Sequence, residues 1–253
     1  MTRTIFLLLF FVAFMKPLSA SEMSFSEEFQ GEMTLTRFFS DAPGQNIKVS
    51  VYVHPDFLMF QNPDGAVMSL MGNHRAHTVI VRNQRNDIVF LTSDNKALVM
   101  RKQEVQQMIQ MMENIAQAHG QSLKSGPSYQ FTQKEEEKHI NGWHARKWGA
   151  TSRETSGEWH LWVTRDLNMP WGMLSEDWLT RYSFISELPI SQWLNENKIP
   201  LQGELMSDGK MVEGFSIESI SEEAIHPSRF TIPETYQQVT FQQLLFGQMR
   251  NNR

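Results

Sequence analysis

Histidine is the first residue type to consider for chemistry, because imidazole is the commonest metal ligand in proteins. The chain has eight, of which His74 and His77 lie three positions apart and His144 and His160 lie on a Trp-rich predicted hairpin. Zinc requires three or four His, Cys or carboxylate ligands in a tetrahedral array. His74 and His77 would point to opposite faces of a strand, and His144 with His160 makes only two ligands. With no H-E-x-x-H motif either, we predict structural or solvated histidines, no metal site and no cofactor.

Methionine is abundant, with 16 residues in the chain, and several crowd one predicted helix. Thioethers are soft ligands that favour Cu(I). Met108 and Met112 lie on the apolar stripe of that helix, so packing is the simpler interpretation. A third interpretation is that flexible methionines line a pocket for varied apolar ligands. We retain Met108 and Met112 as candidate ligand-binding residues on this third interpretation.

Nucleophilic and acid–base chemistry has no support in the sequence. The chain has no cysteine, which excludes disulfides, thiol catalysis and a lipid-modified N-terminal cysteine. There is no G-x-S-x-G elbow and no glycine-rich phosphate loop. The adjacent acids at 135–137 and 222–223 are typical of a solvated face. We therefore predict no catalytic residues and a protein that is not an enzyme.

All seven tryptophans fall between Trp143 and Trp193. Large rings dominate core energetics in any fold, and they are also enriched at interfaces and in pockets. The sequence leaves both interpretations open. Trp148, Trp162 and Trp171 are the candidates for contacting a ligand or partner.

The rings must be positioned by a predicted hairpin from Ile140 to Thr164. Successive strand residues point to opposite faces, so each strand carries tryptophan on both. The Ser-, Thr- and Gly-rich stretch 149–157 has the composition of a reversal. We expect an apolar face with Trp143, Ala145, Trp159, Leu161 and Val163, and an opposite face with Trp148, Trp162, His144, Arg146, His160 and Thr164. Trp143→Ala and Trp159→Ala would then unfold the domain, and Trp148→Ala and Trp162→Ala would be tolerated.

The N-terminus indicates export. Arg3 precedes an apolar run over residues 5–15 and a small-residue end at Ala20. This is the pattern of a signal peptide, and the run is shorter than the ~20 residues that span a bilayer. Cleavage after Ala20 would leave a periplasmic, soluble protein that is not lipid-anchored and has no integral membrane span. An uncleaved anchor is the alternative.

The charge balance argues against nucleic acid as a partner. The formal net charge of −5 becomes −7 once residues 1–20, with Arg3 and Lys16, are removed. A mildly acidic protein does not bind nucleic acid or an anionic membrane surface through overall charge.

Short apolar segments dominate the rest of the chain and predict strands; the first two alternate apolar and polar residues. They lie at 29–39, 47–53, 57–60, 77–81, 88–91, 97–100 and 206–217, the last around an Asp208-Gly209 turn. One convincing helix runs from about Lys102 to His119. The expected fold class is α+β, mainly an antiparallel sheet forming a half-open β-barrel wrapped over this one principal helix. The expected division is a signal peptide at 1–20, a single half-barrel domain at 21–240 and a C-terminal tail at 241–253.

Four motifs taken in order resemble a known family: Phe29-x-Gly31, the I-x-G-W-x-A-x-K-W stretch at 140–148, Ile199-Pro200-Leu201, and a closing Ile220 followed by Phe230-x-Ile232-Pro233-x-x-Tyr236. The chain resembles an uncharacterised family of exported bacterial proteins, itself similar to the periplasmic lipoprotein carrier and receptor LolA and LolB. The resemblance covers about Phe29 to Tyr236. It implies a half-open barrel over helices with an apolar concavity, which the aromatic stretch 171–193 would leave open or plug.

Two functions follow as expectations. The first is a periplasmic binding protein that holds an apolar ligand (a lipid, an acyl chain or a lipoprotein segment) or senses the state of the envelope. The alternative is an interaction or scaffold module that docks on another envelope protein through its aromatic hairpin. An open apolar concavity would favour the first, and exposed aromatic rings the second.

Overall fold

The computed structural model describes residues 28–42, 44, 46–69, 75–118, 127–170, 174, 193 and 196–243. The predicted signal peptide, its cleavage site and Trp171 lie outside these residues.

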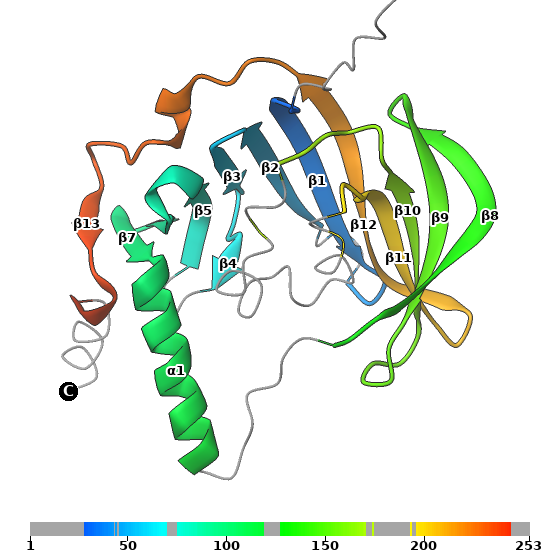
Figure 1. Ribbon diagram of the computed structural model, residues 1–253, viewed down its shortest axis with the longest axis horizontal. Helices are drawn as coiled ribbons and strands as arrows, with labels where there is room; N and C mark the ends of the chain where they lie inside the picture. The colour runs from blue at the N-terminus through cyan, green and yellow to red at the C-terminus, as the bar shows by residue number, and fades with distance from the viewer. Residues whose placement is uncertain are drawn as a thin grey trace, which may run out of the picture.

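One sheet of thirteen strands dominates the described part of the chain (Figure 1). The helical elements there include the 3-10 turns η1 (Asn83–Arg85) and η4 (Pro227–Phe230) and the helix α1 (Lys102–Ala118). The strands are β1 (Gly31–Phe39), β2 (Ile47–His54), β3 (Phe57–Gln61), β4 (Met68–Ser69), β5 (Arg75–Arg82), β6 (Asp87–Thr92), β7 (Lys96–Arg101), β8 (Gln130–Ile140), β9 (Trp143–Thr151), β10 (Glu158–Thr164), β11 (Ile199–Ser207), β12 (Lys210–Glu222) and β13 (Gln237–Val239).

The strand order is β13-β7-β6-β5-β3-β2-β1-β12-β11-β10-β9-β8, with β4 paired beside β5. Most neighbours follow each other along the chain and pair antiparallel, whereas β13 pairs with β7 in parallel. The two ends of this order, β13 and β8, do not pair with each other in the described residues, so the sheet is mixed and open. The predicted fold class, a half-open barrel wrapped over a principal helix, is therefore wrong.

The helix explains part of that error. α1 leaves the sheet directly from the end of β7, beside the β13 edge, and projects past the strands (Figure 1). Val105 and Ile109 are buried in the main core, but Met111 is 47% exposed. The apolar side of the helix is therefore buried as predicted at Val105 and Ile109. It packs against one end of the sheet and not inside a barrel. Within the described ranges, no helix combines the length and apolarity needed to cross a bilayer.

Three apolar clusters stabilise the sheet. The largest extends from the strands around β1–β7 to Ala145, Ile199 and Ile217 in the other half. A second lies under the C-terminal part of the chain. A third gathers Trp159, Leu161 and neighbouring rings at the β8–β12 end. A core of this extent is consistent with a chain that has no disulfides.

The second cluster is covered by residues 223–239, which we call the C-terminal strap. It begins after β12 and passes over the outside of the sheet to β13 (Figure 1). Ile225 and Phe230 of the strap are buried against Tyr52, Met59 and Ile80, which come from three different strands. The strap is thus an extended segment that the sequence analysis did not predict as part of the core.

Turn chemistry sets the hairpins at the other end of the sheet. Asp208 and Gly209, between β11 and β12, both have positive φ (51° and 74°), which confirms the predicted Asp-Gly turn. Asn141 and Gly142, between β8 and β9, also have positive φ (52° and 85°). The sequence analysis missed this Asn-Gly turn and therefore missed β8, whose many charged residues obscure its strand pattern.

Candidate functional site

The predicted aromatic hairpin exists as β9 and β10, but its rings are distributed differently from the prediction. Trp148 lies opposite Leu161, and Trp162 lies opposite Lys147. Directly paired residues share a face, so Trp148 joins Trp159 and Trp162 joins the face of Trp143. The grouping of Trp148 with Trp162 was wrong, because it depended on a register that alternation within each strand does not specify.

Trp148 packs within the third apolar cluster. Its ring is 5.3 Å from the ring of Trp193, which is only 2% exposed, and Lys198 Nζ lies 4.7 Å above it. Lys198 also pairs with Glu196 at 2.5 Å. A neighbouring ring and an ammonium group therefore cover much of the surface that Trp148 was expected to offer a ligand.

Trp162 is covered from the opposite direction. Lys138 Nζ of β8 lies 4.1 Å from its ring centroid and donates to Gln202 Oε1 of β11 at 2.7 Å. Two strands, β9 and β10, separate β8 from β11, so this bond requires the sheet to curl over the ring. Burial lowers the pKa of Lys138. Lys138 and Gln202 thus form a polar cap over the curled β8–β11 end of the sheet. The partly exposed ring of Trp162 lies beneath this cap.

The remaining predicted residues define no site. Met108 and Met112 lie on α1, but their side chains fall outside what the structure describes, and so does Trp171. Within the described residues no three His, Cys, Asp or Glu side chains gather as a metal site would require. His144 lies 3.1 Å from Glu137, and His160 lies 3.8 Å from Glu158.

The four tryptophans give a graded prediction. Trp159 is 3% exposed and Trp143, Trp148 and Trp162 are partly exposed, so Trp159→Ala is expected to cost the most, about 3–5 kcal/mol. The other three replacements should each lower the melting temperature by less. Thermal melts of the four variants followed by circular dichroism test this. An equal decrease in melting temperature for all four variants would contradict the placement of the rings.

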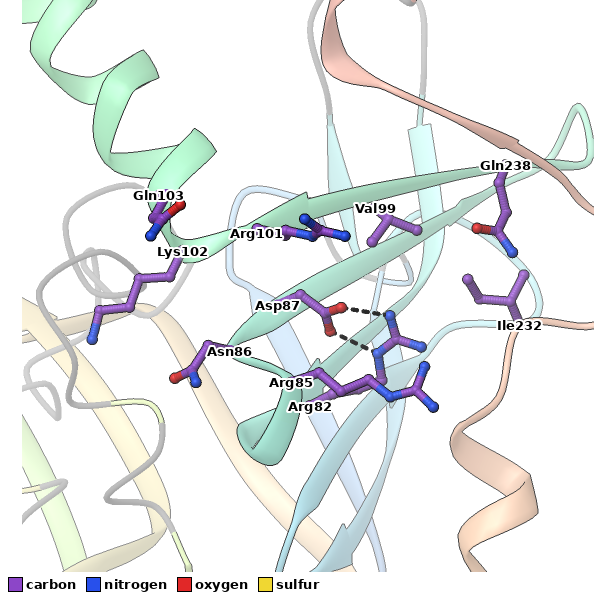
Figure 2. Close-up of a pocket in the computed structure, with 10 residues that line it drawn as sticks. All are labelled: Arg82, Arg85, Asn86, Asp87, Val99, Arg101, Lys102, Gln103, Ile232 and Gln238. Atoms are coloured by element: carbon purple, nitrogen blue, oxygen red, sulfur yellow. Dashed lines mark hydrogen bonds and ion pairs between the residues drawn. The ribbon is translucent and has the colours of Figure 1, made fainter.

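A cavity of about 830 Å³ opens elsewhere, where β5, β6 and β7 meet α1 and the strap (Figure 2). We call it the basic pocket. Its lining residues are Arg82, Arg85, Asn86, Asp87, Val99, Arg101, Lys102, Gln103, Ile232 and Gln238. Three arginines and a lysine thus face one carboxylate, in a protein whose formal net charge is −5.

That carboxylate is already neutralised. Arg82 Nε and Nη2 donate to the two oxygens of Asp87, each at 2.7 Å, and both side chains are over 90% buried. The bidentate pair is drawn as dashed lines in Figure 2. Arg85 and Arg101 form no side-chain ion pair or hydrogen bond with any described residue, so the cavity has uncompensated positive charge.

Local structure holds these cations in place. Arg85 ends η1, the short turn between β5 and β6, and Asn86 after it has a left-handed φ of 50°. The Asn86 carbonyl accepts from Lys102 N–H at 2.8 Å, which ties this turn to the first residue of α1. Arg101 N–H donates to Glu104 Oε2 at 2.9 Å across the same junction. The backbone bond between Lys102 and Asn86 therefore holds the two basic segments side by side.

The strap supplies the opposite wall. Ile232 and Gln238 come from the strap, and with Val99 of β7 they lie across the pocket from Asn86, Lys102 and Gln103 (Figure 2). The Arg82, Arg85 and Arg101 side chains lie between these two ends of the pocket. Sequence reasoning missed it, although the R-N-Q-R segment that starts at the last residue of β5 and the R-K pair that starts at the last residue of β7 were visible as basic groups at strand ends.

No protein-family model and no curated protein matches this chain. Among solved structures, it is similar to PNGF-II in two crystal forms, at TM-scores of 0.43 and 0.41 and identities of 11% and 12%. Each match covers 87% of this chain and 32% or 33% of the other, so this chain spans about a third of PNGF-II. A LolA superfamily protein from Nitrosomonas europaea matches at a TM-score of 0.26 and 8% identity, over 80% of this chain and 89% of that one. These values support the resemblance to the LolA superfamily only weakly, and they indicate no activity.

The basic pocket is the candidate functional site. Arginine guanidinium groups present several N–H donors in a planar fork that matches carboxylate and phosphate oxygens. A pocket with two such groups and no free carboxylate is suited to an anion. Its volume lies within the range of small-molecule sites.

Proposed function

We propose that this protein is an exported binding protein, not an enzyme, and that its ligand is an anionic amphiphile held in the basic pocket. The negatively charged group, a phosphate or a carboxylate, pairs with Arg85 and Arg101. The apolar portion lies along Val99 and Ile232. The observation that carries this proposal is the cavity with two cations that no described residue neutralises.

The charge distribution supports an anion as the ligand. Placing two guanidinium groups on the lining of one pocket costs electrostatic energy unless solvent or a ligand compensates their charge. Asp87 does not provide this compensation, because both of its oxygens are engaged by Arg82. The lining groups other than Asp87 are hydrogen-bond donors, amides or apolar side chains, which suits binding better than proton abstraction.

The apolar wall supports a ligand with a hydrophobic part. Val99 and Ile232 are partly exposed side chains that pack on the second apolar cluster and also face the cavity. An acyl or other apolar group placed there would remove both from water, a gain of about 25 cal/mol per Å². This retains the expectation of an apolar ligand and adds a charged head to it. Export to the periplasm remains a proposal supported by residues 1–20.

The rival proposal, a scaffold that docks through its aromatic hairpin, has less support. Trp148 and Trp162 are covered by Lys198 and Lys138. The large hydrophobic side chains exposed in the described part of the chain are Ile47, Met111 and Val212, which lie on three different elements. Scattered apolar residues of this kind do not make an interface patch.

The test is calorimetric titration with dihexanoyl phosphatidic acid below its micelle concentration. Dihexanoyl phosphatidylcholine has the same chains on a zwitterionic head, and inorganic phosphate has the charge without the chains. We expect the phosphatidic acid to bind most tightly, phosphate weakly and phosphatidylcholine least. Binding should weaken as salt rises, because exposed charges are screened.

The matched variants are Arg85→Gln with Arg101→Gln, and Arg165→Gln as an exposed arginine away from the pocket. A hydrogen bond to a charged group contributes about 1.5–3 kcal/mol, so the double variant should lose tenfold or more in affinity. Arg165→Gln should change nothing. Equal binding of the two lipids, or unchanged affinity in the double variant, would refute the proposal.

A further inference from the structure

A second cavity lies under the strap, on the sheet side. It has a volume of about 320 Å³ and shares no lining residue with the basic pocket. We call it the strap pocket. Its floor is Met59, Ile80 and Leu91, from β3, β5 and β6 respectively, each no more than 5% exposed. Three aliphatic side chains from neighbouring strands give a flat apolar surface.

The rim of the strap pocket is polar and held in place. His77 Nε2 lies 3.0 Å from Tyr236 Oη of the strap, and its Nδ1 lies 2.9 Å from Thr78 Oγ1. Arg229 also belongs to the rim, and its guanidinium carbon lies 3.8 Å above the ring of Tyr52. Stacking of this kind fixes the plane of the guanidinium without using its N–H donors.

Arg229 has no carboxylate partner among the described residues. The rim therefore has one oriented cation over an apolar floor, whereas the basic pocket has several cations. A single guanidinium matches a singly charged group, and the small volume limits the apolar body to a short chain or one ring. The chemistry that fits is a small monocarboxylate.

We propose that the strap pocket is a second binding site, which takes a small monocarboxylate with its carboxylate on Arg229 and its apolar body on Met59, Ile80 and Leu91. The site does not depend on the proposed function of the basic pocket. Both sites do require the strap to be docked, since Ile232 and Gln238 face the basic pocket and Tyr236 faces the strap pocket.

The experiment uses full-length protein with ¹³C-methyl methionine, in which the Met59 resonance is assigned from Met59→Leu. Octanoate is the probe, 1-octanol is the uncharged match, and acetate has the charge without the chain. Octanoate should shift the Met59 signal saturably and bind at least tenfold more tightly than octanol or acetate.

Arg229→Gln should lower the affinity for octanoate about tenfold or more and leave octanol binding unchanged, whereas Arg165→Gln should affect neither. The Arg85→Gln, Arg101→Gln double variant should still bind octanoate at the strap pocket. The proposal is overturned if octanol binds as tightly as octanoate, if Arg229→Gln changes nothing, if Met59 does not respond, or if the double variant abolishes the response. A melt of Arg229→Gln matching that of the wild type excludes unfolding as the cause.

Discussion

Replacing Asp87 by alanine is expected to destabilise the protein by about 3–5 kcal/mol, because it leaves a buried guanidinium without its counter-charge. Asp87 opens β6 and receives two 2.7 Å hydrogen bonds from Arg82 at the end of β5. The two side chains are 8% and 7% exposed. Urea unfolding followed by circular dichroism at neutral pH measures the loss.

Two further variants distinguish the loss of the buried Arg82–Asp87 ion pair from a general effect of removing one charge. Lys48 forms a 3.1 Å ion pair with Glu218 and is 65% exposed, so Lys48→Ala should not shift the urea midpoint measurably. Arg82→Met combined with Asp87→Leu removes both charges and should recover most of the stability that Asp87→Ala loses. If Asp87→Ala costs no more than Lys48→Ala, the pair is not buried in solution.

Replacing Phe230 by alanine should have an effect of similar size, about 3–5 kcal/mol, through loss of the ring that anchors the strap. Phe230 is 1% exposed and stacks on Phe57, with ring centroids 5.0 Å apart and planes at 17°. It packs on Tyr52 and Met59 within the second apolar cluster. Without the ring a cavity would remain between strap and sheet, since the backbone of paired strands cannot collapse to fill it.

The same variant connects stability to binding. The strap lines both pockets, so Phe230→Ala should weaken phosphatidic acid and octanoate together. Hydrogen exchange should accelerate in residues 225–239 more than in β5 and β6, because the strap can open locally. Phe39→Ala, which removes a partly exposed ring on β1, is the control and should leave both ligands bound. Intact binding by Phe230→Ala would show that the strap does not form the walls.

Local sequence patterns determined many of the elements. Alternation placed β1 and β2, short apolar runs bounded by turn residues placed β3, β5, β6 and β7, and three- and four-residue spacing placed α1 within a residue or two. The Asp208-Gly209 turn followed from the φ values that these two residues tolerate. Each of these properties is set by neighbours a few positions apart, which is why the sequence alone sufficed. β8 escaped because an edge strand with charges on both faces has no apolar alternation to detect.

Tertiary structure alone decided the pairings and the site. The β9–β10 register assigned Trp148 and Trp162 to opposite faces, and it depends on how the turn between the strands is built. The expected barrel is a mixed, open sheet instead, because β13 and β8, at the two ends of the strand order, do not pair with each other in the described residues. The basic pocket joins Arg85, Arg101 and Ile232, which are remote in sequence and meet through the sheet order and the strap. The net charge could not predict the basic pocket, because an overall excess of acidic residues does not show where basic side chains lack acidic partners.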